Sequence, residues 1–140
     1  MRNLFRVLCL SIGLALTALV LSNCKKPAGP GGKATIKGRI YVKDFNTAAY
    51  GAPISEYYSP GEAVYISYGT DQSADNDVKT GTDGSFEFLY LRTGHYKIFA
   101  NSRDTSIHVA GTNKVIPVVI DVNLTSNKQV FDVGTITINK

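Results

Sequence analysis

The sequence has 140 residues, enough for one domain behind a leader, and its 15 basic and 11 acidic residues give a net charge of +4. Five of the basic residues precede residue 34, so only ten remain in the rest of the chain, which holds all 11 acidic residues. A nearly neutral domain lacks the clustered Lys and Arg of a nucleic-acid surface, and we therefore expect no nucleic-acid partner.

Residues 1–23 have the pattern of a cleaved secretory leader. Arg2 and Arg6 precede an uncharged apolar run of 15 residues, Val7–Leu21, which has the length of a signal peptide and is short for a membrane span. The two cysteines are Cys9, inside this run, and Cys24, just after it. Cleavage before Cys24 leaves one cysteine, so neither a disulfide nor a cysteine-based metal site is expected within one mature chain.

The four residues Leu21-Ser22-Asn23-Cys24 resemble the lipobox of bacterial lipoprotein precursors: an aliphatic residue, a small residue and then the cysteine. Asn23 stands where Gly, Ala or Ser is usual, a variant common in the Bacteroidetes. The resemblance implies that Cys24 carries a diacylglyceryl thioether and that a further acyl chain can join its amine, which makes the membrane its partner. The alternative is an ordinary secreted protein with a cysteine near its cleavage site.

Residues 24–33, which consist of Cys24 and the stretch KKPAGPGGK, are predicted to be a flexible tether. Gly and Pro form no regular hydrogen-bond ladder, and nine residues at about 3 Å each would hold a domain up to roughly 30 Å from the bilayer. The lipoprotein resemblance also bears on location. Lys25 next to the cysteine argues against inner-membrane retention, and Lys25-Lys26 argues against surface export. We expect the outer membrane, with the domain facing the periplasm.

From Ala34 to Lys140 the apolar residues recur with the period of two that is typical of strands, and Gly, Asn, Asp and Thr interrupt every helical window. Seven short strands in such a length indicate a β-sandwich. The expected strands are Thr35–Lys43, Ala63–Tyr68, Val78–Thr80, Ser85–Leu91, His95–Asn101, Lys114–Asn123 and Val130–Ile138. The expected inward-facing residues are Ile36, Ile40, Val42, Val64, Ile66, Tyr68, Phe86, Phe88, Tyr90, Tyr96, Ile98, Ala100, Val118, Ile120, Val122, Leu124, Ile136 and Ile138.

Three motifs in this region resemble a known family. They are Gly38-Arg39-Ile40, Ala52-Pro53-Ile54 and the run TGTDGSFEFLYLRTGHYKIFA from Thr80 to Ala100. Together they resemble the carboxypeptidase regulatory-like or transthyretin-like (prealbumin-like) modules, most clearly between Ala34 and Ser102. The resemblance implies an all-β fold, a seven-stranded Greek-key β-sandwich, spanning residues 34–140.

The connection from Asp44 to Glu62 is longer than the family pattern and carries Tyr50, Tyr57 and Tyr58. Long aromatic loops on a rigid scaffold can form a binding edge, which would make these three tyrosines candidates for contact with a carbohydrate or peptide. The alternative is that the rings only cover the open end of the sandwich.

The segment DQSADND, Asp71–Asp77, spaces oxygen atoms as a calcium loop does, but it has Asn76 in place of the required Gly and Thr82 in place of the bidentate acid. The EF-hand assignment therefore fails, and we expect a solvated turn, with a looser calcium site as the alternative. His95 and His108 have no partner at ligand or catalytic spacing. We therefore expect no enzyme, metal or cofactor. The expected function is a lipid-anchored structural or interaction module of the cell envelope with a protein or glycan partner, or alternatively a carbohydrate- or peptide-binding lipoprotein that uses loop 44–62.

Overall fold

The structure is a computed structural model that describes residues 27–45, 52–71, 73–105 and 114–140. The expected leader and the candidate residues Cys24, Tyr50 and His108 lie outside these ranges. The described part of the chain is all-β, as predicted, and it contains no helix of the length and hydrophobicity needed to cross a bilayer.

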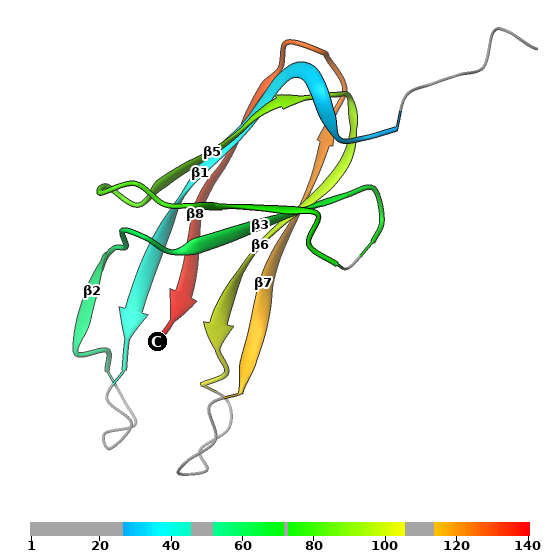
Figure 1. Cartoon of the computed structure of the whole chain (residues 1–140). Helices are drawn as coiled ribbons and strands as arrows, with labels where there is room; N and C mark the ends of the chain where they lie inside the picture. The colour runs from blue at the N-terminus through cyan, green and yellow to red at the C-terminus, as the bar shows by residue number, and fades with distance from the viewer. Residues whose placement is uncertain (1–26, 46–51, 72, 106–113) are drawn as a thin grey trace, which may run out of the picture.

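Within the described residues, eight strands form the fold (Figure 1). The seven expected strands are present, with ends that shift by up to five residues. The additional strand, β2, lies inside the connection that was expected to be a loop. The strands are β1 (Pro30–Asp44), β2 (Ser55–Tyr58), β3 (Ala63–Tyr68), β4 (Asn76–Lys79), β5 (Ser85–Leu91), β6 (Gly94–Arg103), β7 (Val115–Leu124) and β8 (Val130–Asn139).

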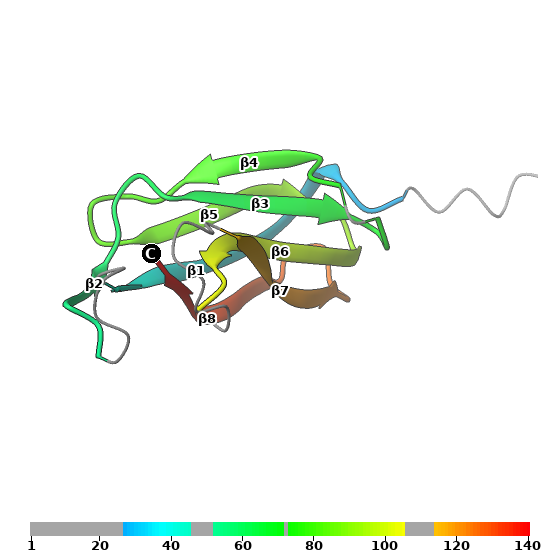
Figure 2. The same cartoon turned by 90° about the horizontal axis from the view of Figure 1, so that it is seen from below.

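The strands form two four-stranded sheets that pack as a sandwich. In the first, sheet A, β1 is central: β8 pairs with one of its edges in parallel, while β5 and β2 pair with the other edge, both antiparallel. The second, sheet B, is antiparallel in the order β4-β3-β6-β7. Figure 2 shows β4 at one margin of the sandwich and β7 and β8 near each other at the opposite margin.

The core lies between the sheets and consists largely of the predicted inward-facing residues. Tyr90 is the exception: it is 69% exposed, and Leu91 takes the buried position instead. The cause is the backbone of Tyr90, whose φ of 59° lies in the left-handed region and shifts the alternation of the strand by one residue. Tyr68, Val118 and Ile120 are only partly buried against the core.

The structure also places the start of the domain before the predicted boundary at residue 34. Pro30 to Lys33 are part of β1, and a side chain at Gly32 would lie 1.9 Å from the carbonyl oxygen of Leu91. Only glycine permits this approach of two backbones. The described part of the predicted tether is therefore packed against β5, and the reading of Gly and Pro as a free linker was wrong for residues 30–33.

Candidate functional site

Tyr57 and Tyr58, the two described tyrosines of loop 44–62, do not share one face of the fold. Tyr57 and Tyr58 are neighbours on β2, so their side chains point to opposite faces of sheet A. Tyr57 is paired with Val42, which is buried in the core, whereas Tyr58 is paired with Tyr41 on the outer face. The candidate binding residues Tyr57 and Tyr58 are thus divided between two faces, because a strand alternates its side chains.

Tyr58 belongs to a group on the outer face of sheet A that we call the tyrosine–arginine cluster: Arg39, Tyr41, Glu56 and Tyr58. The rings of Tyr41 and Tyr58 meet edge to face with centroids 5.2 Å apart. The guanidinium carbon of Arg39 lies 5.3 Å from the centroid of Tyr58, within cation–π range. The two interactions hold the ring of Tyr58, which is 43% exposed, in a defined orientation.

Glu56 completes the cluster. The hydroxyl of Tyr41 donates a hydrogen bond of 3.0 Å to Oε2 of Glu56, and Lys43 lies 3.8 Å from Oε1. The hydrogen bond to a carboxylate raises the pKa of Tyr41, because loss of the phenolic proton would place two negative charges side by side. Tyr41 therefore remains a neutral hydrogen-bonding group.

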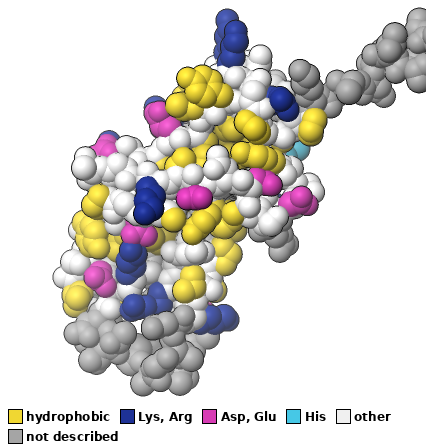
Figure 3. All heavy atoms as spheres, viewed as in Figure 1, with side chains coloured by type: hydrophobic (Ala, Val, Ile, Leu, Met, Phe, Trp, Pro, Cys, Tyr) yellow, Lys and Arg dark blue, Asp and Glu magenta, His cyan; other side chains and the backbone are white. Residues whose placement is uncertain are grey.

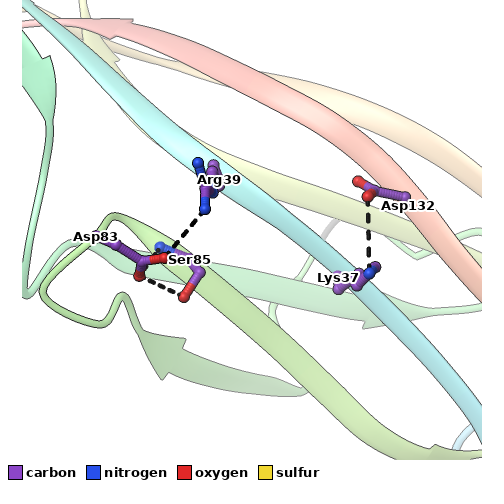
Figure 4. Close-up of polar contacts among 5 residues, drawn as sticks. All are labelled: Lys37, Arg39, Asp83, Ser85 and Asp132. Atoms are coloured by element: carbon purple, nitrogen blue, oxygen red, sulfur yellow. Dashed lines mark hydrogen bonds and ion pairs between the residues drawn. The ribbon is translucent and has the colours of Figure 1, made fainter.

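A shallow groove of about 420 Å³ continues from this cluster along β1. Lys37 and Arg39 project into it from β1, and acidic residues of two other elements face them (Figure 4). Arg39 contacts Asp83, in the turn before β5, at 3.2 Å, and Lys37 contacts Asp132 of β8 at 4.0 Å. All four side chains are roughly half exposed, so a ligand could reach them.

Asp83 is held by both of its oxygens. Oδ1 accepts hydrogen bonds from the amide and the hydroxyl of Ser85, at 3.1 and 2.6 Å, while Oδ2 contacts Arg39. The bonds from Ser85, and less strongly the charge of Arg39, lower the pKa of Asp83. At neutral pH this group is therefore a fixed hydrogen-bond acceptor and not a proton donor.

A β-bulge shapes the floor of the groove. Lys37 pairs with Asp132 but Arg39 pairs with Thr135, so that two residues of β8, Val133 and Gly134, lie opposite the single Gly38. Gly134 has a φ of 74°, and its amide donates a 2.8 Å hydrogen bond to Oδ1 of Asp132. The bulge thus holds Oδ1 of Asp132 while Oδ2 contacts Lys37, and its two facing glycines, Gly38 and Gly134, add no side chain to this part of the groove.

Sequence reasoning missed most of this site. Its residues come from β1, β2, β8 and the turn before β5, and the two ion pairs of the groove join residues that are 44 or more positions apart. One local signal was present: Lys37, Arg39, Tyr41 and Lys43 alternate with the buried residues of β1 and so had to share the outer face.

Two other regions are weaker candidates for a binding site. A depression of about 340 Å³ lies beside Ser102, Arg103 and Val115, but the charged Glu62 and Lys140 on its wall form an ion pair with each other. In the segment Asp71–Asp77, Asp75 accepts a hydrogen bond from the amide of Tyr68. No group of three or more metal-ligating side chains occurs among the described residues.

No protein family model matches the sequence, and no curated protein matches it. Among solved structures, a proposed carbohydrate-binding protein of Pseudomonas aeruginosa has a TM-score of 0.44 and 14% identity, over 81% of this chain and 92% of its own. A 9R-lipoxygenase of Cyanothece has a TM-score of 0.34 and 15% identity, over 99% of this chain and 24% of its own. At these TM-scores neither similarity carries an argument about this chain.

Proposed function

We propose that the chain is a lipid-anchored β-sandwich of the cell envelope that acts as a non-enzymatic interaction module. Cys24 is the attachment point, and the domain lies at the outer membrane, facing the periplasm. The observation that carries the proposal is the lipobox Leu21–Cys24, directly behind an uncharged run of signal-peptide length. The run from Thr80 to Ala100 further supports a transthyretin-like module with Greek-key topology.

Metabolic labelling tests the anchor. Cells that express the full chain are grown with a clickable fatty acid, beside cells that express Cys24→Ala. We expect the label on the wild-type protein and none on the variant, because the thiol and the new amine of Cys24 are the acylation sites. An unlabelled wild-type protein, or equal labelling of both proteins, would sink the proposal.

A second candidate function, the binding of a glycan, rests on the tyrosine–arginine cluster and its groove. An exposed, oriented tyrosine ring can stack on the apolar face of a sugar, and the adjacent Arg39 and Asp83 can bond to its hydroxyl groups. Because these charged groups already hold each other in place, they lose little conformational freedom when a ligand binds.

Tyr57 supplies a matched control for this candidate. It is adjacent to Tyr58 and similarly exposed, at 40% against 43%, but it faces the other side of sheet A. On glycan arrays we expect Tyr58→Ala to bind about tenfold more weakly than the wild type, as for loss of an aromatic anchor, and Tyr57→Ala to bind normally. A wild-type protein that binds no glycan, or equal losses in the two variants, would exclude this site.

A further inference from the structure

The first described residues are fixed to one end of the sandwich. The amide of Gly29 donates a 2.9 Å hydrogen bond to the hydroxyl of Tyr96, and the carbonyl of Gly29 accepts one from the amide of Arg92, also at 2.9 Å. This end, which we call the N-proximal end, also contains the β5–β6 turn and the β7–β8 connection (Figure 1). The chain therefore joins the domain at a defined place.

The distance from this place to Cys24 is short. Only Lys25 and Lys26 separate Cys24 from Pro27, and three trans peptide units span at most about 11 Å. If Cys24 is acylated, as the proposed function requires, the N-proximal end must lie within this distance of the lipid headgroups.

The same end carries exposed apolar side chains on the outer face of sheet A. Thr35 is paired with Val130 of β8 on one side. On its other side it lies opposite Leu89 and Tyr90 of β5, because Ala34 is paired with Leu91 and Ile36 with Phe88. Leu89 is 49% exposed, Tyr90 69% and Val130 62%. Such a group of large apolar residues is unusual on a face that is otherwise charged. Exposed apolar patches of this kind mark surfaces that bind a protein or a membrane.

Three basic residues lie at the same end of the domain. Lys33 is exposed and its amide is bonded to Asn127, in the connection that also carries the exposed Lys128. Arg92 lies in the β5–β6 turn. Within residues 27–45, 52–71, 73–105 and 114–140, none of the three forms a salt bridge. Figure 3 shows basic and hydrophobic side chains together at the upper end of the molecule.

We propose that these six residues, the N-proximal patch (Lys33, Leu89, Tyr90, Arg92, Lys128 and Val130), dock directly on the surface of the bilayer that holds Cys24. Leu89, Tyr90 and Val130 enter the interfacial layer, where tyrosine is favoured, while the three basic side chains contact lipid phosphates. The inference rests on the proposed lipid anchor and adds an orientation to it. Asp71 and Asp75 belong to the β3–β4 connection of sheet B. Because lipid phosphates repel these carboxylates, the docked molecule tilts so that sheet A lies closer to the lipid than sheet B.

The test uses the full acylated chain in vesicles of phosphatidylcholine and phosphatidylglycerol, with a fluorophore at a single introduced thiol. Leu89→Cys reports on the patch, and Val119→Cys is the matched control, since Val119 is 46% exposed on the outer face of sheet B. We expect blue-shifted emission from the Leu89 position and quenching by doxyl-labelled lipids. Neither change is expected at the Val119 position.

Charge variants supply the second readout. Lys33→Glu combined with Lys128→Glu should reduce the quenching at the Leu89 position, whereas Lys79→Glu, an exposed lysine of β4, should not. Mass spectrometry of the same samples separates the two proposals. An acylated protein with equal signals at both positions overturns the docking alone, and absence of acyl chains overturns the anchor and the docking together. Blue-shifted emission without quenching would indicate a second copy of the chain on the patch and would also overturn the docking.

Discussion

Asp83 shows how a single exposed residue organises the groove. Its two hydrogen bonds from Ser85 hold the turn before β5, and its other oxygen orients Arg39, which in turn lies over Tyr58. One carboxylate thus connects the turn, the groove and the tyrosine–arginine cluster. Its influence depends on its ionised form, because only the carboxylate accepts from Ser85 and attracts Arg39 at the same time.

The first prediction concerns Asp83→Asn. The pKa of Asp83 is lowered in the folded chain, so its contribution to stability is complete above the ordinary aspartate pKa and is lost as the pH falls through the folded value. We expect the variant to melt at a lower temperature than the wild type at neutral pH and at the same temperature in strong acid. Thermal unfolding at several pH values measures this difference.

Asp77→Asn is the control for this experiment, since Asp77 is exposed on β4 and makes no ion pair among the described residues. A difference between Asp83→Asn and the wild type that persists in acid would show that charge is not the cause.

Tyr96 acts at the scale of whole elements. Tyr96 lies near the start of β6, an inner strand of sheet B. Its hydroxyl donates a hydrogen bond to the carbonyl of Arg92 at 2.7 Å and accepts one from the amide of Gly29. It thereby joins the β5–β6 turn to the segment that precedes β1. Burial raises the pKa of Tyr96, so the neutral hydroxyl is retained until the pH rises through the raised folded value.

The second prediction is that Tyr96→Phe releases the N-terminal segment. Loss of the hydroxyl leaves the amide of Gly29 and the carbonyl of Arg92 without this partner. This should lower the free energy of unfolding by about 1–3 kcal/mol. Hydrogen exchange should become faster at Gly29 and its neighbours and change little in the centre of β6. Tyr68→Phe is the control, because the hydroxyl of Tyr68 has no hydrogen bond within the described residues. Equal exchange rates at Gly29 in the two variants would contradict the proposal that the Tyr96 hydroxyl holds the N-terminal segment.

At the scale of the whole molecule, apolar contacts contribute more than ion pairs to holding the two sheets together. The core side chains are at most 3% exposed, whereas each of the five ion pairs among the described residues has at least one partner that is substantially exposed to water. Exposed pairs of this kind contribute little, since water and salt screen their attraction.

The third prediction compares one residue of each kind. Ile98 is fully buried in β6. The substitution Ile98→Ala should lower the free energy of unfolding by about 2–5 kcal/mol, because it leaves a cavity between the sheets. Lys37→Ala breaks the 4.0 Å contact with Asp132 and should change stability by less than about 1 kcal/mol. Urea unfolding measures both values. A cost for Lys37→Ala as large as that for Ile98→Ala would contradict this account.

Where the sequence failed to predict the fold, the missing information was not local. β2 was missed because its four residues are all exposed and so show no alternation of buried and exposed positions. Tyr90 was predicted to lie in the core because no neighbouring residue in the sequence predicts its left-handed backbone conformation. Gly29 and the residues after it were read as a linker because their partner Tyr96 is 67 positions away.

The sequence by itself determined the features that depend on neighbouring residues. These are the lipobox pattern at Cys24, the seven strands that bury one face, and the inward rows of the core, since alternation is a local property of an extended chain. Only the tertiary structure decided which strand edges join. The parallel pairing of β1 with β8 brings Lys37 to Asp132, and the pairing of β1 with β2 places Tyr58 beside Arg39 while it turns Tyr57 away. These contacts depend on register between distant segments, which the pattern of a single strand does not contain.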